Sequence, residues 1–141
     1  MNDSILTTGQ CLCGAVKYKI TAEPMRMAAC HCKGCQRSSG TGHMALAFFK
    51  DSEITIEGET SSFDAKADSG NINSRHFCPK CGSRLFTRNS GRPGVTGVAV
   101  GCADDNSWFS PQAVVYNSRR ESWDEIPLDI PKFDGMPPPP K

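Results

Sequence analysis

The spacing of the cysteines constrains this chain more than any other feature. Seven of its eight cysteines fall in three short clusters, and one stands alone. The clusters are Cys11 and Cys13, then Cys30, Cys32 and Cys35, and finally Cys78 and Cys81, with Cys102 as the single cysteine. Thiols at such short spacing are typical of metal ligands, and a metal that gathers ligands from distant clusters fixes how the chain folds.

The N-terminal residues indicate the compartment in which these thiols are found. The stretch MNDSILTTGQ has neither the cationic start nor the apolar run of a signal peptide. The longest apolar run, Met44 to Phe49, is far too short to span a bilayer. We therefore expect a cytoplasmic protein. A reducing compartment keeps thiols unpaired, so the clusters are interpreted as metal sites rather than disulfides.

Length and charge limit the remaining classes of protein. The chain has 141 residues, a common size for one domain, and we expect a single domain over residues 1–134 followed by a proline-rich tail over residues 135–141. Charged residues make up 22% of the chain, and the formal net charge is +1. Such a balance gives no general attraction to nucleic acid or to an anionic membrane, so neither is expected as a partner.

The distribution of apolar and turn residues predicts a mainly β protein. Short apolar or alternating runs predict strands over residues 13–20, 43–50, 53–58, 61–65, 73–78, 83–87, 94–101 and 108–116. The segment KGCQRSSG predicts one helical turn that ends at Gly40, and no window has the sustained apolar period of a long helix. From about Gly135 the tail is expected to be extended and partly disordered.

Two of the cysteine pairs together predict a closed zinc site. In CPKCG, residues 78–82, the two-residue gap turns both sulfurs towards one point, and Gly82 permits the tight turn. Cysteines two apart on an extended segment share a face, so Cys11 and Cys13 supply the second pair. The alternative interpretation is a set of buried cysteines without metal. The predicted structural zinc ligands are Cys11, Cys13, Cys78 and Cys81.

The central cluster supplies one thiolate fewer than a closed zinc site takes. Cys30, Cys32 and Cys35 converge on one point, combining a strand-like pair with a two-residue turn. Catalytic zinc keeps three protein ligands and one open position, whereas structural zinc is closed. These three cysteines therefore favour a catalytic zinc, and a fourth protein ligand would end that interpretation.

The candidates for a fourth ligand are one cysteine and three histidines. Cys102 ends the apolar run GVAVGC, and a small core residue is its simpler interpretation. Ordinary surface or core histidines are likewise the simpler interpretation of His43 and His76. His31 stands between two ligands on an extended segment, so it is expected to point away from the metal and either donate a hydrogen bond or be exposed.

The order of these motifs resembles the glutathione-dependent formaldehyde-activating enzyme family, which includes the centromere protein V relatives. The motifs are Cys11-x-Cys13-Gly14-Ala15-Val16, Cys30-His31-Cys32-x-x-Cys35-Gln36-Arg37 with Gly40, and Phe77-Cys78-x-x-Cys81-Gly82-Ser83. Individually weaker matches follow at Asp104, Asp105, Pro111, Gln112, Arg119, Trp123 and the stretch ending at Phe133. The resemblance covers roughly residues 9–133.

The resemblance implies a compact β-tent fold of antiparallel sheets organised around two zinc ions. By position it assigns the structural ligands as Cys11, Cys13, Cys78 and Cys81, and the catalytic ligands as Cys30, Cys32 and Cys35. The family activity is condensation of formaldehyde with glutathione to S-hydroxymethylglutathione, which implies a carbon–sulfur lyase with a small thiol, glutathione among the candidates, as its substrate. Zinc favours deprotonated sulfur ligands, so a thiol suits the open site.

Two functions remain open at this point. The first is a zinc-dependent carbon–sulfur lyase or synthase that acts on a small thiol adduct. The second is a noncatalytic module with two structural zincs that binds a macromolecular partner, since a fold alone does not fix a function. Five basic residues have two alternative interpretations: contact with the carboxylates of glutathione, or simple exposure to solvent. They are Lys33, Arg37, Arg75, Arg84 and Arg88.

Overall fold

The computed structural model describes residues 5–137, which form a mainly β protein with two sheets, as predicted. The strands are β1 (Thr7–Gln10), β2 (Lys17–Ile20), β3 (Arg26–Cys30), β4 (Met44–Lys50), β5 (Ile54–Glu57), β6 (Ser61–Lys66), β7 (Ile72–Phe77), β8 (Arg84–Asn89), β9 (Val95–Ala99) and β10 (Ala113–Val115). The helices are α1 (Lys33–Ser39) and three 3₁₀ turns, η1 (Asp51–Glu53), η2 (Val100–Cys102) and η3 (Asn117–Arg119). None of the described helices has the length and apolar character needed to cross a membrane.

The smaller sheet has the order β1-β2-β5, with antiparallel neighbours. Alternation along β2 buries Tyr18 and Ile20 and leaves the intervening lysines exposed. The Tyr18 ring packs edge-on against Phe86 of the larger sheet, with ring centroids 5.4 Å apart. The buried face of the small sheet thus packs on the large sheet, and the main hydrophobic core lies between them.

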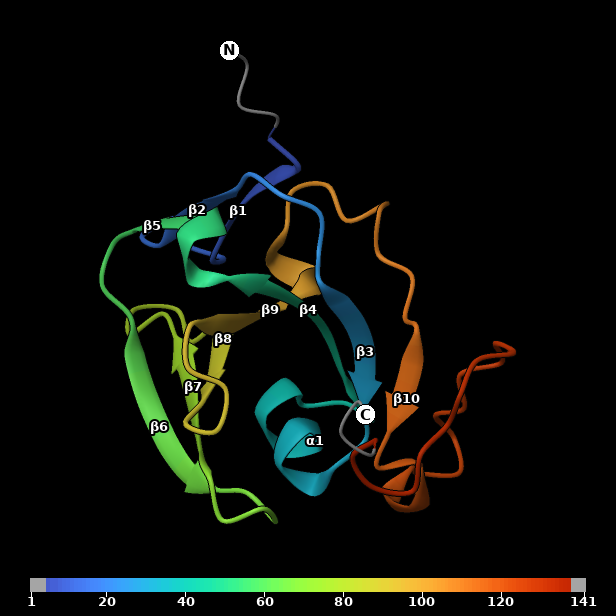
Figure 1. The fold of residues 1–141 in the computed structure, drawn as a ribbon. Helices are drawn as coiled ribbons and strands as arrows, with labels where there is room; N and C mark the ends of the chain where they lie inside the picture. The colour runs from blue at the N-terminus through green and yellow to red at the C-terminus, as the bar shows by residue number, and fades with distance from the viewer. Residues whose placement is uncertain (1–4, 138–141) are drawn as a thin grey trace.

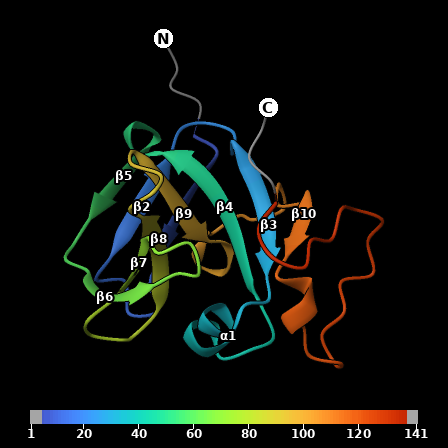
Figure 2. The same cartoon turned by 60° about the horizontal axis from the view of Figure 1, so that its bottom comes forward.

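The larger sheet has seven strands in the order β10-β3-β4-β9-β8-β7-β6. Its pairs are antiparallel except β10 and β3, which run parallel. The sheet is strongly bent, so that β6 and β10 stand on opposite sides of α1 in both views (Figures 1 and 2). A register shift between His76 and Phe77 adds to the bend in β7. The bent sheet therefore has a concave face, and α1 lies within it.

The central strand β4 serves two apolar environments. Ala47 and Phe49 are fully buried in the core between the sheets. Leu46 and Phe48 alternate with them and face a cavity on the concave side. This two-sided apolar character explains why MALAFF is a continuous apolar run and not an alternating one.

The predicted helical turn is confirmed as α1. The Cys32 sulfur accepts a hydrogen bond from the Cys35 backbone N–H and so caps the N-terminus. Gly40, with φ 75°, caps the C-terminus, as the sequence predicts. The amide of Gln36 donates to the carbonyl oxygens of His31, at 2.8 Å, and Arg119, at 3.0 Å. These bonds fasten the short helix to both flanking segments.

Several predicted boundaries differ from the structure. Strands β1 and β3 were not predicted, and the strand predicted over 13–20 begins only at Lys17 because residues 11–16 form a turn. The strand predicted over 108–116 shortens to Ala113–Val115. The segment from Gly135 to Pro137 lies beside the cavity, with the Gly135 carbonyl accepting from the Tyr116 backbone N–H at 3.1 Å. The rest of the expected disordered tail, residues 138–141, lies outside the described residues.

Candidate active site

The structure brings Cys11, Cys13, Cys78 and Cys81 into one cluster, with their sulfurs all within 4.8 Å of one another. The Cys13 sulfur lies 3.7 Å from that of Cys11 and 3.8 Å from that of Cys78. A tetrahedron with zinc–sulfur bonds of about 2.3 Å has edges of about 3.8 Å. The four-thiol cluster therefore fits a zinc ion.

Hydrogen bonds favour the thiolate form of two cysteines in the four-thiol cluster, Cys11 and Cys81. The Cys11 sulfur accepts from the Val16 backbone N–H at 3.3 Å, and the Cys81 sulfur lies 3.2 Å from the Ser83 hydroxyl. The hydroxyl and then the backbone N–H of Ser83 lower the pKa of Cys81 to about 5. Gly14 and Gly82 adopt φ of 80° and 79°, which permits both turns. Both cysteine turns thus suit binding of a cation.

Cys30, Cys32 and Cys35 form a second cluster, also within 4.8 Å. Cys30 ends β3, Cys32 caps α1 and Cys35 lies in its first turn, so a strand end and a helix start hold the three sulfurs together. Within residues 5–137, no other cysteine, histidine or carboxylate joins this three-thiol cluster. The structure groups the thiols as their spacing predicts, and the structural and catalytic roles remain predictions.

The three sulfurs of the second cluster lie close enough to perturb one another's ionisation. Hydrogen bonds with Cys32 and Cys35, and then burial, raise the pKa of Cys30. The same kind of bonds from Cys30 and Cys35 lower the pKa of Cys32. Close packing of three thiolates is unfavourable by itself, and a bound cation would offset their charge. The donor set fits zinc, which prefers thiolate ligands.

The remaining candidate ligands lie elsewhere. Cys102 packs beside the core that contains the four-thiol cluster, and its thiol donates to the Arg84 carbonyl at 3.4 Å. The His76 ring lies 3.1 Å from the Thr60 hydroxyl. Neither residue belongs to a metal-like cluster among the described residues.

His31 and His43 form a separate group with Asp124. His31 is fully buried, with Nδ1 3.0 Å from the Gly42 carbonyl, so the alternative of an exposed His31 is wrong and that of a hydrogen bond is confirmed. His43 Nδ1 lies 2.6 Å from Asp124 Oδ2. Burial lowers the pKa of His31, which keeps it neutral near pH 7. The group fastens the loop around Asp124 to the segment that follows α1.

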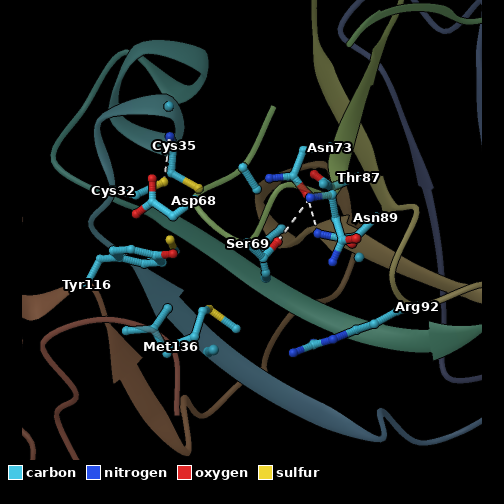
Figure 3. A pocket seen from close by; sticks show the side chains of 18 of the residues that line it. Cys32, Cys35, Asp68, Ser69, Asn73, Thr87, Asn89, Arg92, Tyr116 and Met136 are labelled. Atoms are coloured by element: carbon cyan, nitrogen blue, oxygen red, sulfur yellow. Dashed lines mark hydrogen bonds between the residues drawn. The ribbon is translucent and has the colours of Figure 1, made fainter. Parts of the chain in front are cut away.

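A cavity of about 460 Å³ opens beside the three-thiol cluster (Figure 3). Its walls come from α1 and from seven strands of the bent sheet, and Met136 and Pro137 complete its rim. Cys32, Cys35 and Tyr116 lie on one side in Figure 3, while Asn89 and Arg92 lie on the other. The volume is that of a small-molecule site, with mixed apolar and polar walls.

Tyr116 holds an unusual backbone conformation in the cavity wall. Within residues 5–137 it is the only non-glycine residue with positive φ, at 54°. Such a conformation costs about 1–3 kcal/mol and persists at functional sites where the surrounding structure enforces it. The Arg119 guanidinium lies over the Tyr116 ring, 5.0 Å from its centroid, in a cation–π contact. The strain thus lies in the wall beside the three-thiol cluster.

Arg75 lies between the sheet and the start of α1. A Cβ on Gly34 would come within 2.7 Å of its guanidinium, so the Arg75 side chain packs closely against the start of the helix. The buried Nε of Arg75 has no hydrogen-bond partner among the described residues. Its positive charge contributes to the lowered pKa of Cys32, after the hydrogen bonds from the neighbouring thiols. Arg75 is therefore placed to offset the negative charge of three thiolates.

Only two of the five basic residues singled out from the sequence line the cavity, Lys33 and Arg75. Arg84 and Arg88 are engaged in hydrogen bonds outside it, and Arg37 is exposed on α1. Four further basic residues line the cavity and were not predicted there from the sequence: Arg26, Lys66, Arg92 and Arg119. Only Arg26 had a signal in the sequence: on an extended strand it lies on the same face as Cys30. That signal could not be used because β3 was not predicted.

These features define a class: a mainly β protein with two cysteine clusters suited to zinc, one of which opens on a cavity. The sequence profile of the glutathione-dependent formaldehyde-activating enzyme family matches residues 6–119. The chain belongs to that family.

Individual relatives agree with this assignment. A Halomonas elongata protein named "Putative glutathione-dependent formaldehyde-activating enzyme" is 27% identical over 128 residues, covering 86% of this chain and 82% of that protein. A Schizosaccharomyces pombe protein named as an uncharacterized lyase is 30% identical over 78 residues, covering 55% of this chain and 54% of the relative. A crystal structure of a Rhodobacter sphaeroides protein covers 69% of this chain and 87% of its own, with a TM-score of 0.55 and 21% identity, and shares the fold.

Proposed function

We propose that the protein is a zinc-dependent carbon–sulfur lyase or synthase that joins formaldehyde to the thiol of glutathione, or of another small thiol, and reverses that reaction. The observation that carries the proposal is the three-thiol cluster, which opens on the cavity and has no fourth ligand among the described residues. The family and the lyase name of one relative support the same class of reaction.

The proposed reaction balances without an oxidant or a further co-reactant. The thiolate sulfur attacks the aldehyde carbon, a carbon–sulfur bond forms, and the carbonyl π bond breaks. The proton of the thiol ends on the former carbonyl oxygen, which gives a hydroxymethyl thioether. Zinc bound by Cys30, Cys32 and Cys35 would supply a Lewis acid that favours the thiolate over the thiol.

The residues around the cluster assist by charge and by shape. Arg75 offsets the negative charge of the three cysteines, so that a further anionic sulfur meets less repulsion. Leu46 and Val115 give the cavity apolar walls near the thiols, and Phe48 extends these walls toward Arg26. Walls of this kind limit water near the reacting atoms and strengthen the electrostatic interactions there.

Protein purified under reducing conditions without chelator is expected to carry close to two zinc ions per chain and no disulfide, because each thiol cluster fits one ion. Elemental analysis gives the zinc content. Thiol titration of the unfolded, metal-free chain should return eight free thiols. A protein without zinc, or with paired cysteines when freshly purified, would contradict the assignment of both sites.

Cobalt replacement tests the open site directly, since cobalt absorption reports the type and number of ligands. Added glutathione should shift the spectrum of one of the two metals and leave the other unchanged. The Cys102→Ala variant should respond in the same way, because Cys102 lies outside both clusters. If no small thiol changes either spectrum, the second metal is closed, and a noncatalytic zinc module replaces the proposed enzyme.

A further inference from the structure

The side chains that line the cavity carry more positive charge than the protein as a whole. Six lining residues are basic and one is acidic, whereas the formal net charge of the chain is +1. Arg119 pairs with the single acid, Asp68, at 3.0 Å, and Lys33 pairs with Glu121 at 3.0 Å. Among residues 5–137, the other four have no carboxylate partner within ion-pair distance. They are Arg26, Lys66, Arg75 and Arg92.

Arg26 and Arg92 come together at one end of this cavity. Arg26 begins β3 opposite Phe48 of β4, and its guanidinium lies 5.1 Å from the centroid of that ring. Arg92 lies in the turn between β8 and β9. Burial, and then the positive charge of Arg92, lower the pKa of Arg26. Arg26 pairs with Phe48, Phe48 pairs with Gly97 of β9, and the turn that carries Arg92 leads into β9, so both arginines line the same part of the cavity. Two guanidiniums there, without a carboxylate partner among the described residues, favour binding of an anion.

This end of the cavity is remote from the three thiols. Arg26, Ala28 and Cys30 alternate along β3 and all face the cavity. A strand rises about 3.3 Å per residue, so the Cα atoms of Arg26 and Cys30 lie about 13 Å apart along the strand. Figure 3 shows Arg92 on the side of the cavity opposite Cys32 and Cys35. A ligand that reaches both ends must therefore be extended.

We propose that Arg26 and Arg92 form a carboxylate subsite that binds the end of the thiol substrate remote from its sulfur. This inference rests on the proposed function, because it places the sulfur at the three-thiol cluster. Guanidinium groups bind carboxylates with paired hydrogen bonds. Glutathione offers a bare carboxylate at its glycine end, while the carboxylate of its γ-glutamyl end has an ammonium neighbour that two guanidiniums repel. The subsite therefore takes the glycine end, and it discriminates against free cysteine, whose carboxylate lies too near the sulfur.

The test pairs two ligands with matched variants. Cobalt-substituted protein is titrated with glutathione and with its glycine-end ethyl ester, which lacks that carboxylate. Glutathione should bind the wild-type protein about tenfold or more tightly than the ester, since hydrogen bonds to charged groups are strong. In Arg92→Gln and Arg26→Gln, the affinity for glutathione should fall to that for the ester, and the affinity for the ester should not change. Arg37→Gln, an exposed arginine outside the cavity, should preserve the difference.

The outcomes separate this subsite from the proposed function. S-methylglutathione keeps both carboxylates but cannot form a thiolate, and calorimetry measures its binding independently of cobalt. If it binds and Arg92→Gln weakens it, the subsite stands even if no thiol shifts the cobalt spectrum. If thiols shift the spectrum but the acid and the ester bind alike, or Arg92→Gln weakens both equally, the subsite is wrong. Thermal melts show whether Arg26→Gln is folded. Because Arg92 is exposed in a turn, Arg92→Gln should not disturb the fold, and it tests the subsite independently.

Discussion

Cys81→Ser is expected to prevent most of the chain from accumulating as soluble folded protein. Cys81 belongs to the four-thiol cluster, which ties the turn after β1 to the turn between β7 and β8. Loss of a ligand there should release the zinc, and metal binding energy is coupled to folding energy. The loss should be several kcal/mol, against a total stability of about 5–15 kcal/mol for a typical domain. Soluble yield, chemical unfolding and zinc content measure the effect.

Cys102→Ser is the matched control for that variant. It makes the same chemical change at a half-buried cysteine that packs beside the same core but belongs to neither cluster. Its melting temperature should stay near that of the wild type, and its zinc content should stay at two ions. If Cys81→Ser melted like Cys102→Ser and kept both ions, the structural role of the four-thiol cluster would be excluded.

Cys32→Ser should leave a folded protein that has lost about one zinc ion and all activity toward thiol adducts. The three-thiol cluster lies within residues 30–35, so its metal joins no distant parts of the chain. Cys32 also caps α1, and serine is among the preferred N-cap residues, so the substitution removes the sulfur but preserves a cap. Activity is measured as S-hydroxymethylglutathione formation and its reversal.

A comparison of the two serine variants decides between the two functions left open by the sequence. A catalytic three-thiol site gives Cys32→Ser a thermal melt near that of the wild type and Cys81→Ser a severe loss of stability. Equal collapse of both variants in thermal melts would mean that both zincs are structural. The cobalt titration should then show no response to thiols, so the two experiments check each other.

Most of the fold class and the grouping of the thiols were predictable because their signals are local. The four cysteines of the closed cluster meet as predicted, since each pair is closely spaced, with one residue between Cys11 and Cys13 and two between Cys78 and Cys81, and a glycine follows each pair. Strands such as β2 and β8 carry β-branched or aromatic residues beside turn signals. Strand β3, with the sequence RMAAC, does not: Ala and Met have little strand preference, and its extended conformation depends on pairing with β4 and β10.

The cavity was not predictable, because it depends on contacts between residues that are distant in the sequence. Its walls combine residues from α1 and seven strands, and the bend of the large sheet, which the sequence does not encode locally, brings Arg26 and Arg92 into one cavity. Arg75 was singled out for its charge, but its position against Gly34 depends on the packing of α1 into the concave face. Lone basic residues are exposed far more often than they line a site, so sequence alone cannot separate the two cases.

The two clusters differ in how far along the chain their ligands lie, and this affects the thermodynamic linkage between metal and folding. Cys30 and Cys35 are close neighbours, so an unfolded chain can already gather the three thiols around an ion. A ligand that binds both the folded and the unfolded chain stabilises the fold only through the difference between the two affinities. Cys11 and Cys81 belong to one cluster but lie far apart in sequence, and an unfolded chain must close a long loop to join them. We therefore expect zinc bound at the four-thiol cluster to act mainly on the folding equilibrium, and zinc bound at the three-thiol cluster to leave that equilibrium largely unchanged.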